Sequence, residues 1–470
     1  MMGAPIPELA DRAELCADRI RESATVLLVS HIDADGLTSA AIAAMALRRE
    51  EIPHQVAFCR QLDEGELERI AVTDHETVLF TDFGSGQIEH IQHHEAAGAF
   101  TAVVVDHHQI GDGDVEHHLN PLLEGVNGST ELSGAGAAYL LARALGDDNR
   151  DLAGLAVIGA VGDMQDATGE LIGANRSIVE EGIEAGVLKT ATDLALYGKQ
   201  TRPLPKLLEY SSEMRIPGVT SNPAGARRFL EDLDIELKED GEWRTWSDLT
   251  IEEKQHITSA IVRLGVQSGV DASEINDLIG TAYELLDETE GTQLRDASEF
   301  STLLNSTARY DRADVGLAVC LGDRDEAYRR AKILLRSHRE NLATGLRWVV
   351  SNGVTAENHL QWFDAGTNIR DTIVGIIAGM SLGENGISRS MPIIAFADKE
   401  GEDNVKVSAR GTHSLTGKGL DLSVVMTEAA AKVGGEGGGH NVAAGATIPD
   451  GAQDTFLATA DELVGKQLAD

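Results

Sequence analysis

The chain has 470 residues, of which 42% are hydrophobic and 4% aromatic, so it is too long for one compact core and predicts two or three domains. Its 77 acidic and 39 basic residues give a formal net charge of -38, which excludes the overall basic surface typical of nucleic-acid-binding proteins. Regular apolar runs between the acids argue against disorder and indicate an acidic surface of the halophilic kind.

The first third of the chain predicts a parallel sheet. Apolar, β-branched runs at residues 25–30, 76–80 and 100–105 lack alternation, as in strands covered on both faces. Helical stretches separate and follow these runs, at residues 38–48, 64–70, 88–97 and 152–161, with a further helix after Ser133 as its N-cap. The predicted fold class is therefore α/β, with a parallel-sheet first domain over residues 1–187.

The character of the sequence changes after residue 188. Prolines, and charged segments such as residues 271–288 that we expect to be helical, predict a helical insert over residues 188–299, a candidate surface for a partner protein. Residues 300–341 predict connecting helices. Strand character returns at residues 346–350 and 391–396, so we expect a C-terminal α/β domain over residues 342–470.

Three separated cysteines, Cys16, Cys59 and Cys320, form no paired motif, which argues against a disulfide framework or a zinc ribbon. Residues 1–20 do not have the pattern of a secretory signal, and no apolar run reaches the roughly 20 residues that span a bilayer. We therefore expect a soluble cytoplasmic protein without membrane partners.

Acidic residues follow each predicted strand of the first domain. The segment His31-Ile32-Asp33-Ala34-Asp35-Gly36 follows the first, Asp82 the second and Asp106-His107-His108 the third, while Asp163 ends the helix over residues 152–161. Ligands of parallel sheets gather at the carboxyl ends of the strands. A lone aspartate there is commonly a turn or cap residue, but the repetition favours one metal site. Carboxylates mixed with imidazoles suit Mn²⁺ or Mg²⁺, and a pair of such ions suits phosphoester hydrolysis.

The sequence contains three pairs of adjacent histidines in different settings. His107 and His108 directly follow a strand-end aspartate, which favours ligation or a supporting role beside the ligands. The pairs at residues 93–94 and 117–118 lack that setting, so we expect them at the surface.

The C-terminal part carries candidate phosphate-binding residues. The glycine run at residues 434–439 lets backbone N–H groups approach an anion, and His440 and Asn441 add side-chain donors; a flexible linker is the alternative. The predicted strand at residues 405–411 ends near Arg410, which suits bidentate phosphate recognition; a solvated strand end is the alternative.

Together these segments resemble the DHH phosphoesterase family, named for the triplet that stands here as Asp106-His107-His108. Residues 33–36, Asp82 and residues 162–163 resemble its other metal motifs, and residues 408–410 and 437–440 resemble the substrate motifs of its associated C-terminal domain. Residues 303–309 and 374–378 resemble segments of RecJ-type single-strand exonucleases. Bacterial RecJ usually has a histidine where Arg370 aligns and ends in an oligonucleotide-binding fold that this sequence lacks, so the chain is more similar to the archaeal RecJ-like group, which includes the GINS-associated nuclease. The acidic composition suggests a haloarchaeal member.

The resemblance implies a set of site residues and two ions of Mn²⁺ or Mg²⁺. The implied metal ligands are His31, Asp33, Asp35, Asp82, Asp106, His107, His108 and Asp163, with Asp106, His107 and His108 also catalytic. The residues implied to hold substrate phosphate across an interdomain cleft are Ser408, Arg410, Gly438, Gly439, His440 and Asn441.

The implied activity is a single-strand-specific exonuclease on DNA or RNA, in replication or repair, with GINS or other replication proteins as partners through the insert. A nanoRNase or nucleotide phosphatase acting on very short oligonucleotides is one alternative, and a replication scaffold associated with GINS is another. Relatives with these motifs act on DNA or RNA and from either end.

Overall fold

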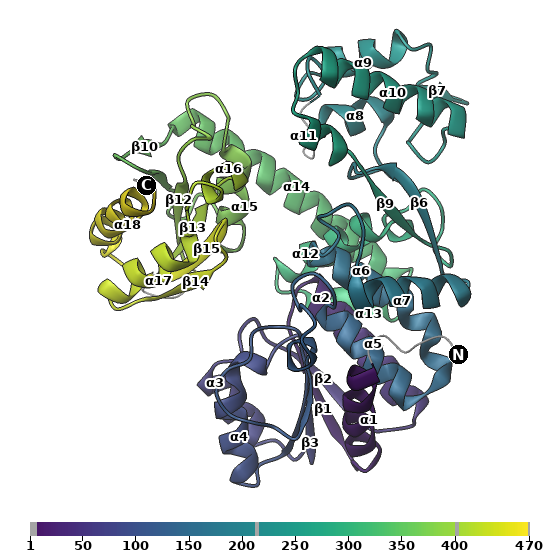
Figure 1. The fold of residues 1–470 in the computed structure, drawn as a ribbon, viewed down its shortest axis with the longest axis vertical. Coiled ribbons are helices and arrows are strands. Elements are labelled where there is room, and N and C mark those ends of the chain that lie inside the picture. Colours follow the sequence, from purple (N-terminus) through teal and green to yellow (C-terminus); the bar gives the residue numbers. More distant parts are fainter. Residues whose placement is uncertain (1–6, 212–215, 400–403, 469–470) are drawn as a thin grey trace. The chain divides into compact units, whose positions relative to one another are not determined.

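The computed structural model describes residues 7–211, 216–399 and 404–468, which divide into two compact units, 1–332 and 333–470 (Figure 1). The ends of the expected first and last domains, residues 1–6 and 469–470, lie outside the described residues.

The first unit is built on the predicted parallel sheet, in the strand order β2-β1-β3-β4-β5. Every residue of β1 and β3 is buried, because helices cover both faces of the sheet (Figure 1). Apolar side chains of α3 and α4 pack on one face of the sheet. The helix residues are Leu67, Ile70, Ile88 and Ile91, and the sheet residues are Leu27, Val29, Val78, Phe80 and Val104. The strands are β1 (Val26–Ser30), β2 (His54–Phe58), β3 (Thr77–Thr81), β4 (Thr101–Val105) and β5 (His117–Leu119), and the helices are α1 (Pro7–Arg21), α2 (Ala34–Arg49), α3 (Glu64–Ala71), α4 (Ile88–Ala96), α5 (Gly134–Leu145) and α6 (Ala153–Gly162).

The register of this sheet aligns the ends of its central strands. Ser30 pairs with Thr81, and Thr81 pairs with Val105, so the residues that follow these three strands emerge at one edge. Those residues are His31, Asp82 and Asp106. The α/β prediction and the convergence of the strand ends are thus confirmed.

The insert begins and ends in a two-stranded ribbon. After α7 (Gly173–Glu184), β6 (Leu188–Leu194) pairs antiparallel with β9 (Ile279–Leu285), and the segment between them has its own core around the buried Trp246. The prediction of a helix through residues 271–288 is wrong, because the β-branched and aromatic run Ile-Gly-Thr-Ala-Tyr forms β9 and only a short helix precedes it. The elements inside the ribbon are α8 (Leu204–Glu209), α9 (Pro223–Glu231), β7 (Lys238–Glu239), β8 (Glu242–Trp243), α10 (Ile251–Gln267) and α11 (Ala272–Asn276).

The predicted connecting helices are α12 (Ala297–Ala308), α13 (Ala313–Cys320) and α14 (Glu326–Asn352). The predicted strand at residues 346–350 is wrong, because these residues continue α14. Leu342 and Val349 are seven residues apart, so they lie on one face of α14, where both pack with Phe363. The apolar residues at 346–350 are thus part of a long amphipathic helix rather than a buried strand.

The second unit holds a mixed sheet in the order β10-β11-β12-β13-β15-β14; β11 pairs parallel with β12, and the other pairs formed by the described strands are antiparallel. α15 (Asp371–Ser381) packs on one face, and α17 (Leu422–Lys432) and α18 (Gln453–Gln467) pack on the other. The other elements are β10 (Thr355–Ala356), β11 (Gln361–Asp364), β12 (Ile393–Asp398), β13 (Asn404–Arg410), α16 (His413–Thr416), β14 (Glu436–Gly439) and β15 (Ala443–Pro449). Of the helices in the described residues, none is long and apolar enough to cross a membrane.

Candidate metal centre

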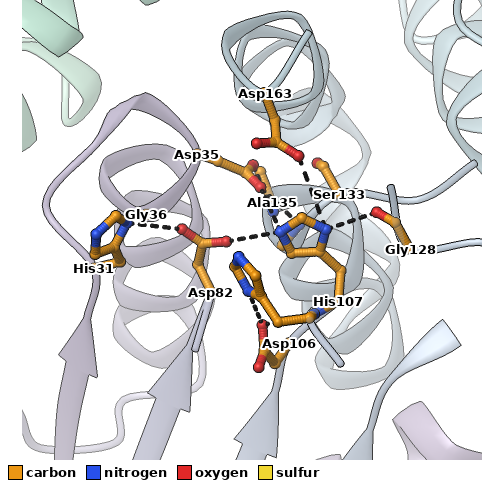
Figure 2. A network of polar contacts seen from close by, with 12 residues as sticks. His31, Asp35, Gly36, Asp82, Asp106, His107, Gly128, Ser133, Ala135 and Asp163 are labelled. Carbon is orange, nitrogen blue, oxygen red and sulfur yellow. Dashed lines mark hydrogen bonds and ion pairs between the residues drawn. The ribbon is translucent and has the colours of Figure 1, made fainter. Parts of the chain in front are cut away.

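Aspartate and histidine side chains meet at the carboxyl edge of the first sheet (Figure 2). Their ligand atoms form three groups, in each of which all atoms lie within 4.8 Å of one another. The groups are Asp82, Asp106, His107 and His108; His31, Asp33 and Asp82; and Asp35, His107 and Asp163. The structure therefore brings together all the side chains predicted as metal ligands.

Asp82 lies at the centre of this cluster. Its Oδ1 is 3.3 Å from His107 Nε2, and its Oδ2 is 3.6 Å from His31 Nδ1 (Figure 2). Oδ1 is buried and accepts no hydrogen bond from the described residues. A Cβ on Gly134 would come within 2.4 Å of the same oxygen, so a glycine is required there. A buried carboxylate oxygen without a partner is costly, and a bound cation would offset that cost.

Asp35 is held by the first turn of α5. Its two oxygens accept hydrogen bonds from the backbone N–H groups of Gly134, at 2.8 Å, and Ala135, at 2.9 Å. Burial, together with the neighbouring carboxylate of Asp82, raises the pKa of Asp35 well above its usual range. Burial and the Asp82 carboxylate raise the pKa of Asp163 as well. This crowding of negative charge fits a site that binds divalent cations.

His107 is buried with a fixed ring orientation. Its Nδ1–H donates to the carbonyl oxygen of Gly128 at 2.7 Å, which turns Nε2 toward Asp82 and Asp35 (Figure 2). Burial alone would lower the pKa of His107, but Asp82, Asp35 and Asp163 raise it well above its usual value. A metal-binding imidazole commonly donates its other ring N–H to a carbonyl in this way.

Asp106 has a different environment from the other aspartates. Its oxygens accept the backbone N–H of Ser85 at 2.9 Å, the backbone N–H of His107 at 2.7 Å and Nδ1–H of His108 at 2.8 Å. Burial would raise the pKa of Asp106, but the bond from His108 and the nearby imidazoles hold it well below its usual range. Asp106 therefore fixes the turn after β4 and orients His108, whose side chain is 55% exposed.

His31 and Asp33 form the outer side of the cluster. His31 Nδ1 lies 3.0 Å from Asp33 Oδ2, and Asp33 Oδ1 accepts the backbone N–H of Gly36 at 3.0 Å, so Asp33 also caps α2. Burial opposes the charged form of His31, but Asp33 and Asp82 raise the pKa of His31 to about 11. His31 is therefore placed to balance carboxylate charge or to bind an ion.

Sequence reasoning did not identify Gln165, which is 3% exposed. Its Nε2 donates to the carbonyl oxygen of Gly128 at 2.8 Å and to Asp163 Oδ2 at 3.1 Å. Its Oε1 accepts Nδ2–H of the buried Asn175 at 2.6 Å. His107 donates to the same Gly128 oxygen. Gln165 therefore helps to orient two candidate ligands, Asp163 by a direct hydrogen bond and His107 through this shared carbonyl. Its proximity to Asp163 in the sequence was the only available signal.

The chain turns sharply between Asp163 and Gln165. The N–H of Gln165 donates to the carbonyl of Ala160, and the N–H of Met164 donates to that of Val161, which is the Schellman ending of a helix. Met164 has a left-handed backbone with φ of 58° at a position where glycine is usual, and its side chain is 74% exposed. This turn directs Asp163 and Gln165 toward the same cluster.

The expectation that the pair at residues 117–118 lies at the surface is wrong for His118, which is 5% exposed. Its Nε2 bonds the hydroxyl of Ser85 at 2.9 Å, and Asn120 donates to the same hydroxyl at 2.8 Å. Ser85 in turn donates its backbone N–H to Asp106. Burial lowers the pKa of His118 to about 4, so it supports the turn as a neutral imidazole. The short edge strand β5, which the sequence analysis did not identify, carries His118 inward.

The segment at residues 303–309 lies against the first motif. Asn305 Oδ1 accepts the backbone N–H of Ala34 at 3.0 Å, at the start of α2. Arg309, at the end of α12, keeps an exposed surface, but partial desolvation lowers the pKa of Arg309, and the Asp33 carboxylate opposes that shift. α12 thereby supports the loop that carries Asp33 and Asp35.

The predicted phosphate-binding residues lie at one end of the second unit's sheet. Arg410 pairs with Ala443 and Gly439 pairs with Ala444, so the ends of β13 and β14 flank the start of β15. A Cβ on Gly375 would come within 2.6 Å of Arg410 Nη2, so α15 approaches this arginine closely. Ser408 is 5% exposed and lies beneath α15.

The glycines of this end differ in their structural need. A Cβ on Gly437 would come within 2.4 Å of the Met426 carbonyl oxygen, and Gly439 has φ of 135°. A Cβ on Gly438 would meet nothing within 4 Å. Close packing and backbone conformation therefore account for glycine at positions 437 and 439, but neither requires glycine at position 438.

Three parts of the chain match described domains. Residues 25–160 match the DHH family N-terminal domain, residues 196–279 the DHH-CID domain and residues 357–466 the DHHA1 domain. An uncharacterized protein of Methanocaldococcus jannaschii is 32% identical over 451 residues, which cover 94% of each chain. The chain belongs to the DHH phosphoesterase family. The predicted family is thereby confirmed.

Solved structures share the fold of this DHH protein. RecJ from Thermus thermophilus, in complex with Mn²⁺, is 16% identical with a TM-score of 0.61, and the match covers 99% of this chain and 56% of that chain. CDC45 from Entamoeba histolytica is 13% identical with a TM-score of 0.63, and the match covers 97% of each chain. The fold is that of a DHH domain with a middle insert and a C-terminal DHHA1 domain.

Proposed function

We propose that this DHH protein is a metal-dependent exonuclease that hydrolyses phosphodiester bonds at one end of single-stranded DNA or RNA. The observation that carries the proposal is the buried Asp82 Oδ1, which accepts no hydrogen bond from the described residues at the centre of the carboxylate and imidazole cluster. The RecJ-like fold, and the residues at one end of the second unit's sheet that we predict to bind phosphate, support the choice of nucleic acid as substrate.

The residues fit two divalent ions. Asp82 belongs to two of the three ligand groups, one with His31 and Asp33 and one with Asp106, His107 and His108. Asp35, His107 and Asp163 form the third group, and these residues together would hold two ions. Mn²⁺ or Mg²⁺ would supply an activated water and stabilise charge on the phosphate. Because Nδ1–H of His107 donates to the Gly128 carbonyl, Nε2 is the ring nitrogen that would bind an ion after it loses its proton.

The other residues position the substrate. Asp106 accepts a hydrogen bond from Nδ1–H of His108. The other ring nitrogen of this exposed side chain, Nε2, would then contact the scissile phosphate or an ion. In the second unit, Arg410 and the backbone around Gly438 would hold phosphate, together with Ser408, Gly439, His440 and Asn441. The cleft expected between the two domains, the domain limits and the association of the insert with GINS stay predictions.

End-labelled strands test the proposal. Purified full-length protein with Mn²⁺ at high salt should shorten strands of twenty nucleotides from one end, and labels at each end of matched DNA and RNA identify polarity and substrate. Asp82→Asn should lose both hydrolysis and Mn²⁺ binding, whereas Asp287→Asn, at an exposed position, should keep both. Hydrolysis by Asp82→Asn at the wild-type rate would contradict the site.

A substrate-length series separates the enzymatic alternatives. Comparable rates on dinucleotides and twenty-nucleotide strands agree with an exonuclease. If dinucleotides are degraded far faster than longer strands, the protein is a nanoRNase and the exonuclease proposal is wrong.

A further inference from the structure

A pocket of about 230 Å³ opens beside the metal centre, entirely within the first unit. Four residues of the cluster line one wall: His108 and three that are labelled in Figure 2, His31, Asp82 and Asp106. The lining residues outside the cluster come from two short segments, the loop between β2 and α3 and the turn after β3. Any molecule in this pocket would therefore contact the metal centre directly.

The pocket has apolar and polar components. Leu62 and Phe83 line it and are 3% and 8% exposed, so their apolar faces are held in place by the core. Gln61 and Gln87 also line it, and neither side-chain amide bonds another of the described residues. Each amide offers two donors and an acceptor. The pocket thus combines fixed apolar surface with uncommitted hydrogen-bonding groups.

An arginine lines the pocket beside the acidic cluster. Arg60 lines the pocket, and its Nε lies 3.1 Å from the Asp311 carboxylate. Its exposed guanidinium forms an ion pair with Asp311 and retains other donors beside the pocket. An anionic group that crosses from the metal centre to the pocket would find both a cation and hydrogen-bond donors.

From these features we infer that the pocket holds the base of the terminal nucleotide whose phosphodiester lies at the metal centre, an inference that rests on the proposed function. Pockets for drug-sized ligands occupy about 300–1,000 Å³, so a smaller volume suits one planar base rather than a dinucleotide. Leu62 and Phe83 supply apolar contact for a base, and contacts with the face of a base tolerate any sequence. Gln61 and Gln87 can match donors and acceptors on any base edge, which suits a nuclease without sequence preference.

Short strands with one abasic nucleotide test this inference. Seven-nucleotide strands carry the abasic nucleotide at the 5′ end, the 3′ end or the centre; binding is measured by fluorescence anisotropy with Ca²⁺, and hydrolysis is measured with Mn²⁺. In the wild type, loss of the base at one end should weaken binding about tenfold, and loss of the central base should have a smaller effect. The sensitive end is the one that enters the pocket.

Two variants link the effect to the pocket. Gln61→Ala combined with Gln87→Ala should bind the intact strand more weakly and should lose most of the additional effect of the abasic end. Gln92→Ala, an exposed glutamine of α4 outside the pocket, should keep the tenfold difference. Both glutamines of the pocket are solvent-accessible, so the variants should fold, which circular dichroism checks.

The outcomes separate the two proposals. Equal binding of the intact and end-abasic strands by the wild type, or an unchanged tenfold difference in the double variant, overturns the base pocket. Absence of hydrolysis of every strand, with the binding difference intact, overturns the exonuclease proposal and leaves the base pocket standing.

Discussion

Replacing Gln165 with methionine tests whether a neutral side chain sets the geometry of the metal centre. Methionine has similar length but neither donates to Asp163 and Gly128 nor accepts from Asn175. Residues that orient metal ligands typically contribute about 10–100-fold to metal affinity. Because Gln165 contacts Asp163 and shares the Gly128 carbonyl with His107, we expect Mn²⁺ affinity to fall by about that factor.

The same substitution has a separate cost in stability. It leaves the buried Nδ2–H of Asn175 without its partner, which costs about 1–3 kcal/mol in the free energy of unfolding. Adding Asn175→Leu replaces both partners with apolar groups and should recover part of this loss, while the Mn²⁺ affinity stays low.

Calorimetric titration of Mn²⁺ and denaturant unfolding of the metal-free protein measure the two effects independently. The reasoning is refuted if Gln165→Met binds Mn²⁺ within twofold of the wild type, or if the double variant regains both stability and affinity.

Other positions give predictions of a different kind. Burial lowers the pKa of His118 from 6.5 to about 4; nearby Arg12 lowers it further, and Asp106 and Asp114 oppose the shift. As pH falls, His118 is therefore protonated in the unfolded chain before it is protonated in the folded protein. The wild type should therefore lose up to about 3 kcal/mol relative to His118→Asn between pH 6.5 and 4, measured by unfolding at each pH. Gly438→Ala should fold normally yet bind single strands more weakly, whereas Gly437→Ala should lower the melting temperature; equal melting temperatures would contradict the packing argument. Met164→Gly should raise the free energy of unfolding by about 0.5–1 kcal/mol, because glycine removes the left-handed strain at little packing cost.

The strand-end aspartates could be predicted because two local regularities act together. Buried parallel strands are recognisable as unbroken apolar runs, and their carboxyl ends share one edge. Asp82 and Asp106 directly follow such runs, and the register of β3 with β4 places them side by side. Asp163 was predictable for a different reason, because it directly follows an apolar run recognisable as a helix.

The supporting residues could not be predicted in this way. Gln165 bonds a carbonyl 37 residues away and an amide 10 residues away, and neither separation follows from a helix or strand period. His118 lies on a strand of three residues, too short to show a hydrophobic pattern. Residues 346–350 were predicted as a strand but belong to α14, because a mostly apolar run of five residues does not distinguish a buried strand from part of a helix.

The insert is fastened to the same loop as the metal centre. The backbone N–H of Thr281 donates to the carbonyl of Gly169 at 2.7 Å, and the N–H of Leu171 donates to the Tyr283 hydroxyl at 2.6 Å. Both partners lie on β9, while the loop they hold begins at Asp163 and Gln165. Deleting the insert would therefore remove two supports of a candidate metal ligand along with any surface for replication proteins. Loss of activity in such a deletion would not identify a scaffold role, whereas substitutions on the exposed face of α10, away from β9, test partner binding without disturbing this loop.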